Sequence, residues 1–410
     1  MLKGPLMSGL GIARKDFFTL FFLLFNTFTW YYITLAMLRR FLDTFPVSDA
    51  DALLIRAVFY AAVIGSTLAG AVIHRTRRLR FLYSWMLLGV IASLLPTVFL
   101  TQGLVWSLLL GVSFGLGIPV ALAYFADRSA LEGRGRISGI IFFLSNLFAP
   151  LFFVSFGMVS LEIAFTLLAF WRAIGLVVFY LLKPQENVTG EVIKRVSFSA
   201  IFANRAFLYY LVPWFMYSLI DQLERVVWAN FLGANFPDLN TLLGLGAPVV
   251  GAFAALLGGL LADWIGRKRV VIYGFVALGL AYAIVGIAPM LRFSWYVYLV
   301  GDGIAGGAFL AIFILTLWGD LAQPGAQEKY YVIGNLPFYI AAFVPLFLDS
   351  YVRSVPPSAS FSLASFFLFI SVLPLLYATE TLPEKKIELR RLKGYIEQAK
   401  KLGEKYAKKK

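Results

Sequence analysis

The sequence contains no cysteine and one histidine, His74, and only 14% of its 410 residues are charged. Without cysteine the chain can form neither a disulfide bond nor a thiolate metal site. It also has no H-E-x-x-H motif and no glycine-rich phosphate loop, so nothing supports a membrane-embedded enzyme. We therefore predict a protein that is not an enzyme, with no catalytic residue, metal or cofactor.

Hydrophobic residues make up 60% of the chain and occur in blocks of about 18 to 25, the length that spans a lipid bilayer. Soluble proteins carry roughly one quarter charged residues, so the composition indicates an integral membrane protein. The first block has the full length of a span, and we expect no cleavable signal peptide. The predicted spans cover 17–38, 52–73, 79–100, 104–126, 137–159, 162–182, 206–229, 241–262, 270–290, 294–318, 330–350 and 360–378.

The net charge of +14 follows the membrane topology and does not indicate nucleic-acid binding. If the amino terminus is cytoplasmic, most Lys and Arg fall in cytoplasmic segments, which is the positive-inside pattern. We predict a multi-pass protein of the plasma membrane with both termini in the cytoplasm, in contact with membrane lipids and monomeric.

Short apolar motifs recur in the same order about 190 residues apart. "FAPLFF" at 148–153 is answered by "FVPLFL" at 343–348, and "GAVIHRTRRLR" at 70–80 by "GLLADWIGRKR" at 259–269. This offset is six spans, an even number, so the two halves have the same orientation. The predicted domains are an N-terminal bundle (1–182), a cytoplasmic linker (183–205), a C-terminal bundle (206–383) and a basic cytoplasmic tail (384–410).

Twelve spans arranged as 6+6, with G-x-x-x-D-x-x-G-R-K between spans eight and nine, resemble the major facilitator superfamily. The motif residues are Gly259, Asp263, Gly266 and Arg267, whereas the first-half copy is degenerate and keeps only Arg78 of the charged pattern. The resemblance implies an all-α membrane protein, with 12 transmembrane helices in two six-helix bundles related by a pseudo-two-fold axis along the membrane normal. Gly266 permits a turn with positive φ, and Asp263 can accept amide hydrogens at the start of the next helix.

The same resemblance implies a secondary active transporter that moves a small solute by alternating access, coupled as a symporter or antiporter to protons or another cation. An uncoupled facilitator is one alternative. A membrane sensor or scaffold that retains the fold without a transport cycle is the other.

Acidic residues end the fourth span of each half, opposite the loop cations. We predict that Asp127 pairs with Arg75 or Arg78, and that Asp320 pairs with Arg267 or Arg269. These pairs would hold the cytoplasmic side closed in one conformation.

Charged residues inside spans are costly and are functional candidates. In span seven Asp221, Glu224 and Arg225 lie near the outer end, where Arg39, Arg40 and Arg56 are also expected. Pairing between the two groups would form an outer gate. The alternative is an ion pair within the helix between Asp221 and Arg225, which are four residues apart.

Asp302 in span ten is flanked by glycines and is a candidate coupling group, together with Asp221. An aspartate that only packs helices together is the alternative. Arg172 in span six is interpreted as a buried structural residue rather than an anion site.

A polar stripe in span one faces aromatic and polar residues of span seven in the predicted cavity. Side chains with apolar bodies and polar tips suit a mixed solute. The candidate substrate contacts are Asn26, Thr27, Trp30, Tyr31, Thr34, Trp214, Tyr217 and Gln222.

Overall fold

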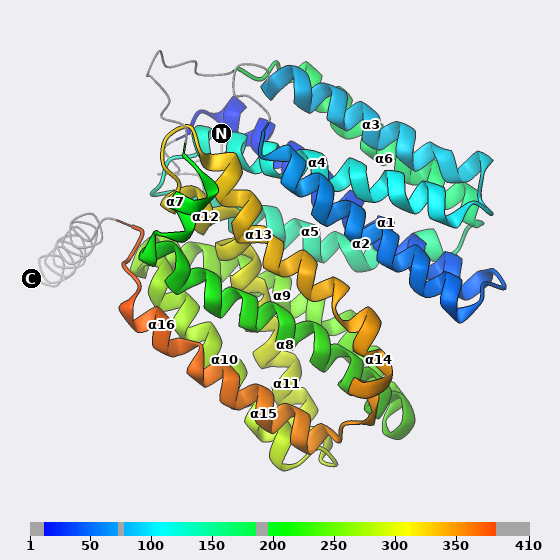
Figure 1. The fold of residues 1–410 in the computed structure, drawn as a ribbon, viewed down its shortest axis with the longest axis vertical. Coiled ribbons are helices and arrows are strands. Elements are labelled where there is room, and N and C mark those ends of the chain that lie inside the picture. Colours follow the sequence, from blue (N-terminus) through cyan, green and yellow to red (C-terminus); the bar gives the residue numbers. More distant parts are fainter. Residues whose placement is uncertain (1–11, 73–77, 186–195, 383–410) are drawn as a thin grey trace, which may run out of the picture.

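The computed structural model describes residues 12–72, 78–185 and 196–382, and all regular structure in these ranges is helical. Arg75 and the basic tail 384–410, for which the sequence made predictions, lie outside the described residues. The first half contains six helices in chain order (Figure 1), namely α1 (Arg14–Thr44), α2 (Asp49–Gly70), α3 (Arg78–Val98), α4 (Gly103–Arg128), α5 (Arg134–Gly157) and α6 (Leu161–Leu181).

The second half follows a five-residue helix in the linker, α7 (Phe198–Phe202). Three of its six segments are continuous helices: α8 (Arg205–Asn235), α9 (Pro237–Ile265) and α10 (Arg267–Ile287). The other three are interrupted, the first of them by the π-helix η2. They are α11 (Arg292–Phe309) with η2 (Leu310–Thr316) and α12 (Leu317–Leu321), α13 (Gln327–Phe343) with α14 (Pro345–Ser354), and α15 (Pro357–Ile370) with α16 (Val372–Tyr377).

Ten helical segments of the described chain are long and apolar enough to cross a membrane, and α13 with α14, bent by 52°, makes an eleventh. The remaining segment, α8, has 31 residues and contains the charged residues Asp221, Glu224 and Arg225. The described helices are consistent with the predicted twelve spans. We call the end at which α1 begins the cytoplasmic end, following the predicted topology, and the opposite end the outer end.

Local sequence explains where several helices begin and end. Ser48 and Ser160 accept amide hydrogens from the first turns of α2 and α6, respectively, as N-cap side chains. Gly266 separates α9 from α10 with a φ of 105°, a left-handed conformation that favours glycine. The turn predicted from the loop motif is confirmed.

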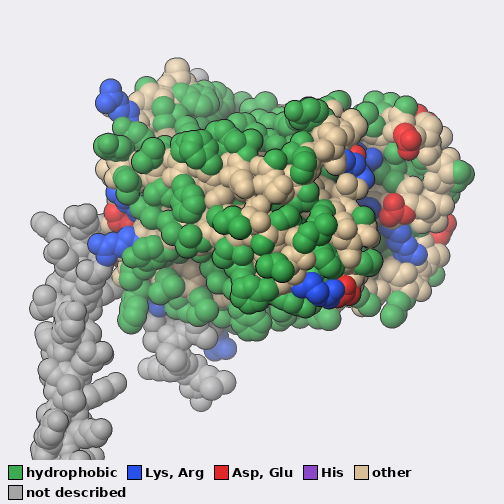
Figure 2. All heavy atoms as spheres, turned by 90° about the horizontal axis from the view of Figure 1, so that it is seen from below, with side chains coloured by type: hydrophobic (Ala, Val, Ile, Leu, Met, Phe, Trp, Pro, Cys, Tyr) green, Lys and Arg blue, Asp and Glu red, His purple; other side chains and the backbone are tan. Residues whose placement is uncertain are grey.

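The surface is hydrophobic along most of its length. Figure 2 shows apolar side chains covering this face, with charged side chains gathered toward the two ends. Large exposed apolar residues such as Phe170, Leu257 and Phe366 contribute to this hydrophobic surface. A lipid-facing surface needs this distribution because hydrocarbon cannot solvate charge.

The two halves pack most closely where α5 crosses α9, between the upper and lower groups of helices in Figure 1. Glycines on both helices make the approach possible: a Cβ atom added to Gly259 would overlap the backbone of Gly135. A Cβ atom added to Gly139 would lie 2.7 Å from the Ala255 carbonyl oxygen and 3.3 Å from the Gly259 Cα. Small residues at such crossings let the backbones come close together.

Candidate functional site

Asp263 of the loop motif connects the two halves at the cytoplasmic end. Its carboxylate is 2% exposed and accepts hydrogen bonds from the backbone nitrogens of Gly135 (3.0 Å) and Arg136 (2.9 Å). The Arg136 and Arg267 side chains also contact it, at 3.2 and 3.1 Å. The positive end of the α5 dipole favours this anion.

This arrangement corrects one expectation. Asp263 was expected to accept amides of the next helix, α10, but it accepts those of α5 in the other half. The α10 amides of Arg267 and Lys268 instead donate to Glu380, at 2.9 and 3.1 Å. Two carboxylates therefore satisfy two helix N-termini at this end.

Asp320, at the end of α12, is shared between the halves. Its carboxylate is fully buried and contacts Arg134 of α5 at 2.5 Å and Arg267 of α10 at 3.0 Å, and Thr381 donates to it at 3.1 Å. The predicted contact with Arg267 is present, and the alternative partner Arg269 is exposed. Arg134, a contact between the halves, was not predicted.

A third connection involves Arg78, at the start of α3. Its guanidinium lies 2.6 Å from Asp127 of α4, as predicted, and also donates to Glu328 of α13 in the second half, at 3.1 Å from Nε. Gln327 donates to Asp127 at 2.8 Å. The predicted pair is therefore part of a connection between the halves.

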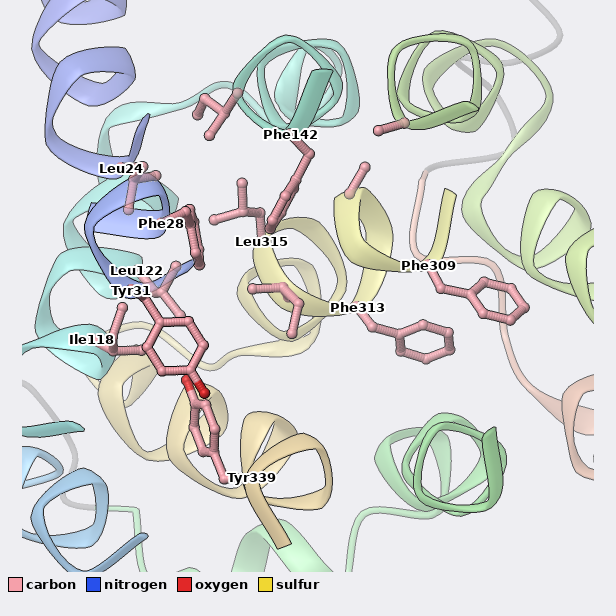
Figure 3. Close-up of a cluster of buried hydrophobic side chains, with 14 of the residues drawn as sticks. Leu24, Phe28, Tyr31, Ile118, Leu122, Phe142, Phe309, Phe313, Leu315 and Tyr339 are labelled. Carbon is pink, nitrogen blue, oxygen red and sulfur yellow. The ribbon is translucent and has the colours of Figure 1, made fainter. Parts of the chain in front are cut away.

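An apolar cluster fills the interface next to these ion pairs. Figure 3 shows Phe28 and Tyr31 of α1 and Phe142 of α5 approaching Leu315 of η2 and Tyr339 of α13. The hydroxyl groups of Tyr31 and Tyr339 are directed toward each other. The Tyr31 ring stacks on Phe114 at 4.0 Å. The cytoplasmic half of the interface is thus closed by charge and by packing.

At the outer end, the predicted gate residues pair within their own halves. Arg40 donates to the carbonyl oxygens of Phe156 and Val159, both at 2.6 Å, and joins α1 to the α5–α6 turn. Arg39 lies 3.9 Å from Asp43, and Arg56 donates to the Ala52 carbonyl oxygen at 3.3 Å; these two arginines are exposed.

The acidic residues of the predicted gate also pair locally. Asp221 lies 3.2 Å from Arg225, which is the intrahelical alternative, and accepts from Gln222 at 3.0 Å. Glu224 is 4% exposed and faces α15, where Ser360 donates to it at 2.6 Å. Gate pairing between the halves is absent from these described residues in this conformation.

Asp302 of α11 is not the isolated carboxylate that the sequence suggested. It interacts electrostatically with Asp221 and Arg225 of α8, and its buried Oδ1 has no hydrogen-bond partner. Arg225 also interacts with Tyr32 and Tyr60 of the first half. We call Asp221, Arg225 and Asp302 the outer charged cluster. The Arg225 side chain is 59% exposed, so this member of the cluster is accessible.

Three of the five α1 stripe residues bind other helices of the first half, which corrects their expected orientation. Asn26 and Thr27 accept hydrogen bonds from Arg172 at 3.0 and 2.9 Å, Trp30 donates to Ser93 at 2.8 Å, and Thr34 bonds back to the Trp30 carbonyl oxygen. Tyr31 of the predicted stripe lies at the interface between the halves.

Arg172 is fully buried, and these contacts identify the partners that the sequence could not supply. Its guanidinium lies 4.8 Å from the Trp30 ring and 4.5 Å from the Trp85 ring, as cation–π pairs. It joins α6 to α1 and α3, in agreement with a structural residue.

The candidate substrate contacts of predicted span seven, which is α8, lie between the outer charged cluster and the hydrophobic core. Trp214 is fully buried and stacks on Phe313 at 4.7 Å, and Tyr217 meets Phe309 edge-on at the same distance. Gln222 binds Asp221, next to the outer charged cluster. Tyr32 and Tyr60 were missed, although Tyr32 directly follows the predicted Tyr31.

Comparisons with known proteins agree with this architecture. No protein-family model matches the chain. It is 26% identical over 228 residues to the class D tetracycline resistance protein of Salmonella ordonez, covering 52% of this chain and 57% of that protein. It is 30% identical over 175 residues to facilitated glucose transporter member 4 of solute carrier family 2 from Sus scrofa, covering 40% of this chain and 88% of that protein.

Three solved structures share the fold. The human organic anion transporter MFSD10 matches with a TM-score of 0.65 and 16% identity, covering 88% of this chain and 99% of that one. The proton:xylose symporter XylE matches with a TM-score of 0.65 and 13% identity, covering 90% of this chain and 96% of that one. The E. coli fucose:proton symporter FucP matches with a TM-score of 0.63 and 14% identity, covering 89% of this chain and 98% of that one.

Proposed function

The chain belongs to the major facilitator superfamily of membrane transporters, and from this premise we propose that it is a secondary active transporter that moves a small solute by alternating access, driven by protons or another cation. The observation that carries this proposal is the asymmetry of its interface. Ion pairs and apolar packing close the cytoplasmic end, whereas the charged residues of the outer end pair within their own halves. This asymmetry supports an outward-facing state within a two-state cycle.

In this proposal the outer charged cluster is the coupling site. Asp302 has a buried oxygen without a partner, and it lies within electrostatic reach of Asp221 and the accessible Arg225. Binding of a proton or cation at Asp302 changes the charge that Arg225 and Asp221 must balance. A cluster that changes charge between two states is suited to ion coupling.

The test is uptake by purified protein in liposomes. We expect Asp302→Asn to abolish solute accumulation driven by a pH or cation gradient, while exchange of labelled for unlabelled solute continues. Asp349→Asn, which breaks an exposed pair with Arg353, is the matched control and should leave driven accumulation intact. Undiminished driven accumulation in Asp302→Asn would remove this residue from the coupling site.

The solute itself is to be found by its effect on stability. Binding to the folded state raises the unfolding temperature by mass action, so a thermal-shift screen of the purified protein against metabolite pools selects candidates for the uptake assay. The names of the relatives and structural neighbours refer to sugars, organic anions and tetracycline. Compounds of these three classes are therefore the first to screen.

An uncoupled facilitator is the second candidate, and the likeness to a facilitated glucose transporter favours it. This candidate predicts gradient-independent flux that Asp302→Asn does not alter. A sensor or scaffold predicts no solute flux in either direction.

We further propose the domain boundaries 1–182, 183–205, 206–383 and 384–410, with both termini cytoplasmic and the protein in the plasma membrane as a monomer surrounded by lipid. The positive-inside charge pattern supports this orientation. Accessibility of single introduced cysteines to a membrane-impermeant reagent tests it, since the chain has none of its own.

A further inference from the structure

Glu224 is a second buried carboxylate that the coupling site does not use. It lies on α8, it is 4% exposed, and its side chain points into the second half toward α15. Ser360 donates to Oε1 at 2.6 Å, while Oε2 is buried with no hydrogen-bond partner. Within the described part of the chain Glu224 forms no ion pair.

An ionised carboxylate in these surroundings is unfavourable. Transfer of an unpaired charge from water into a protein interior is strongly unfavourable, and one serine hydroxyl offsets only part of that cost. Protonation removes the charge and gives Oε2 a hydrogen. Neutralisation is the response expected of a buried acid with no cation beside it.

The neighbours of Glu224 supply no compensating charge. Tyr282 of α10 and Tyr298 of α11 interact with it electrostatically, and α15 has no titratable residue. On α8 itself, Asp221 and Arg225 pair with each other. The charged residues of the other elements packed against α8 have partners elsewhere. These are Asp238 with Arg292, Asp263 with Arg136 and Arg267, Glu328 with Arg78, Lys329 with the Val196 carbonyl oxygen, and Asp349 with Arg353.

A metal ion is a poor alternative to a proton. Monovalent and divalent metal ions need several oxygen ligands, whereas only Oε2 is free here. No group of three or more acidic, histidine or cysteine side chains suited to a metal occurs in the described ranges.

We propose that Glu224 is a proton-binding site, occupied at neutral pH in this conformation, with the proton on Oε2 and Ser360 donating to Oε1. Tyr282 interacts electrostatically with both Glu224 and Asp302, and its buried hydroxyl has no hydrogen-bond partner. Tyr298 interacts electrostatically with the same two acids, so two tyrosines couple the Glu224 site to the outer charged cluster. The role of this proton in transport rests on the proposed function, but its presence does not.

Infrared difference spectroscopy of the full-length protein tests the proposal, because a protonated carboxylic acid has a carbonyl band separate from that of a carboxylate. We expect a protonated-acid band at neutral pH that is lost in Glu224→Gln. Glu162→Gln, which removes an exposed glutamate from the first turn of α6, is the control and should leave the band unchanged.

Ser360→Ala provides a second variant that keeps the acid. Loss of the hydroxyl donor should shift the band without abolishing it. A spectrum that Glu224→Gln leaves unaltered, or a band insensitive to Ser360→Ala, would overturn the assignment. The spectra need neither solute nor gradient, so a failure here is separate from a failure of the Asp302 uptake test.

Discussion

The two ends of the interface use charge differently. At the cytoplasmic end the carboxylates of Asp263 and Asp320 are buried, and each contacts arginines or amides from both halves. At the outer end Asp221 pairs with an arginine of its own helix, and Arg40 binds carbonyl oxygens of its own half. Ion pairs join the halves at one end, whereas the ion pairs of the described residues at the other end lie within single halves.

This difference indicates which ion pairs stabilise the observed conformation most. A buried ion pair is strongly disrupted when one partner is removed, because the other charge is left without compensation, whereas an exposed pair contributes little. Substitutions at the cytoplasmic end should therefore change the distribution between conformations. Substitutions at the outer end should change coupling with little effect on the fold.

Removal of the carboxylate shared by two arginines should have the largest effect. We expect Asp320→Asn to destabilise the closed cytoplasmic end by ~3–5 kcal/mol, because Arg134 and Arg267 lose their common partner. Distances between spin labels placed at Arg80 and Trp264, at the cytoplasmic end, should increase, while those between Met158 and Met290, at the outer end, should decrease.

Asp349→Asn serves as the control for that measurement, since its pair with Arg353 is roughly half exposed. Unchanged label distances in Asp320→Asn would show that charge does not hold the cytoplasmic end closed.

A smaller effect is expected from the helix crossing. Gly259→Val should destabilise the same closed end by ~1–3 kcal/mol through overpacking, because its side chain would overlap the Gly135 backbone. Gly244→Val, on the same helix but with no atom within 4 Å of its added Cβ, should leave the distances unchanged. Equal behaviour of the two valine variants would contradict a role for close packing.

The smallest effect on stability should come from the outer end. Arg225→Gln removes a pair whose arginine is 59% exposed and whose aspartate is 13% exposed, and we expect a loss of about 1–2 kcal/mol in the free energy of unfolding, smaller than that in Asp320→Asn. Thermal unfolding of the purified variant measures it. A loss as large as that in Asp320→Asn would erase the contrast between the two ends.

The sequence predicted features that depend on local pattern or on the internal repeat. The turn at Gly266 and the pairs Arg78–Asp127 and Arg267–Asp320 followed from a loop motif next to helix ends. Glu328, Arg134 and Glu380 were missed because their contacts depend on how distant helices approach one another.

The predicted orientation of the polar residues on α1 was wrong, and the reason is physical. A polar side chain in a lipid-embedded bundle turns toward any available partner, and the buried Arg172 binds Asn26 and Thr27 within the first half. A polar stripe therefore identified a buried network and did not identify a solute-facing surface. Tyr31, between the apolar Phe28 and Leu35, faces the other half instead.

The π-helix Leu310–Thr316 lies between Asp302 and Asp320 on one segment of the chain. Its wider turn shifts the angular phase of everything that follows, since each residue of an α-helix advances by about 100°. One continuous rod can thereby direct one acid to the outer charged cluster and another to Arg134 and Arg267. If these seven residues formed a regular α-helix instead, Asp320 would be rotated away from both arginines without any change in a contacting side chain.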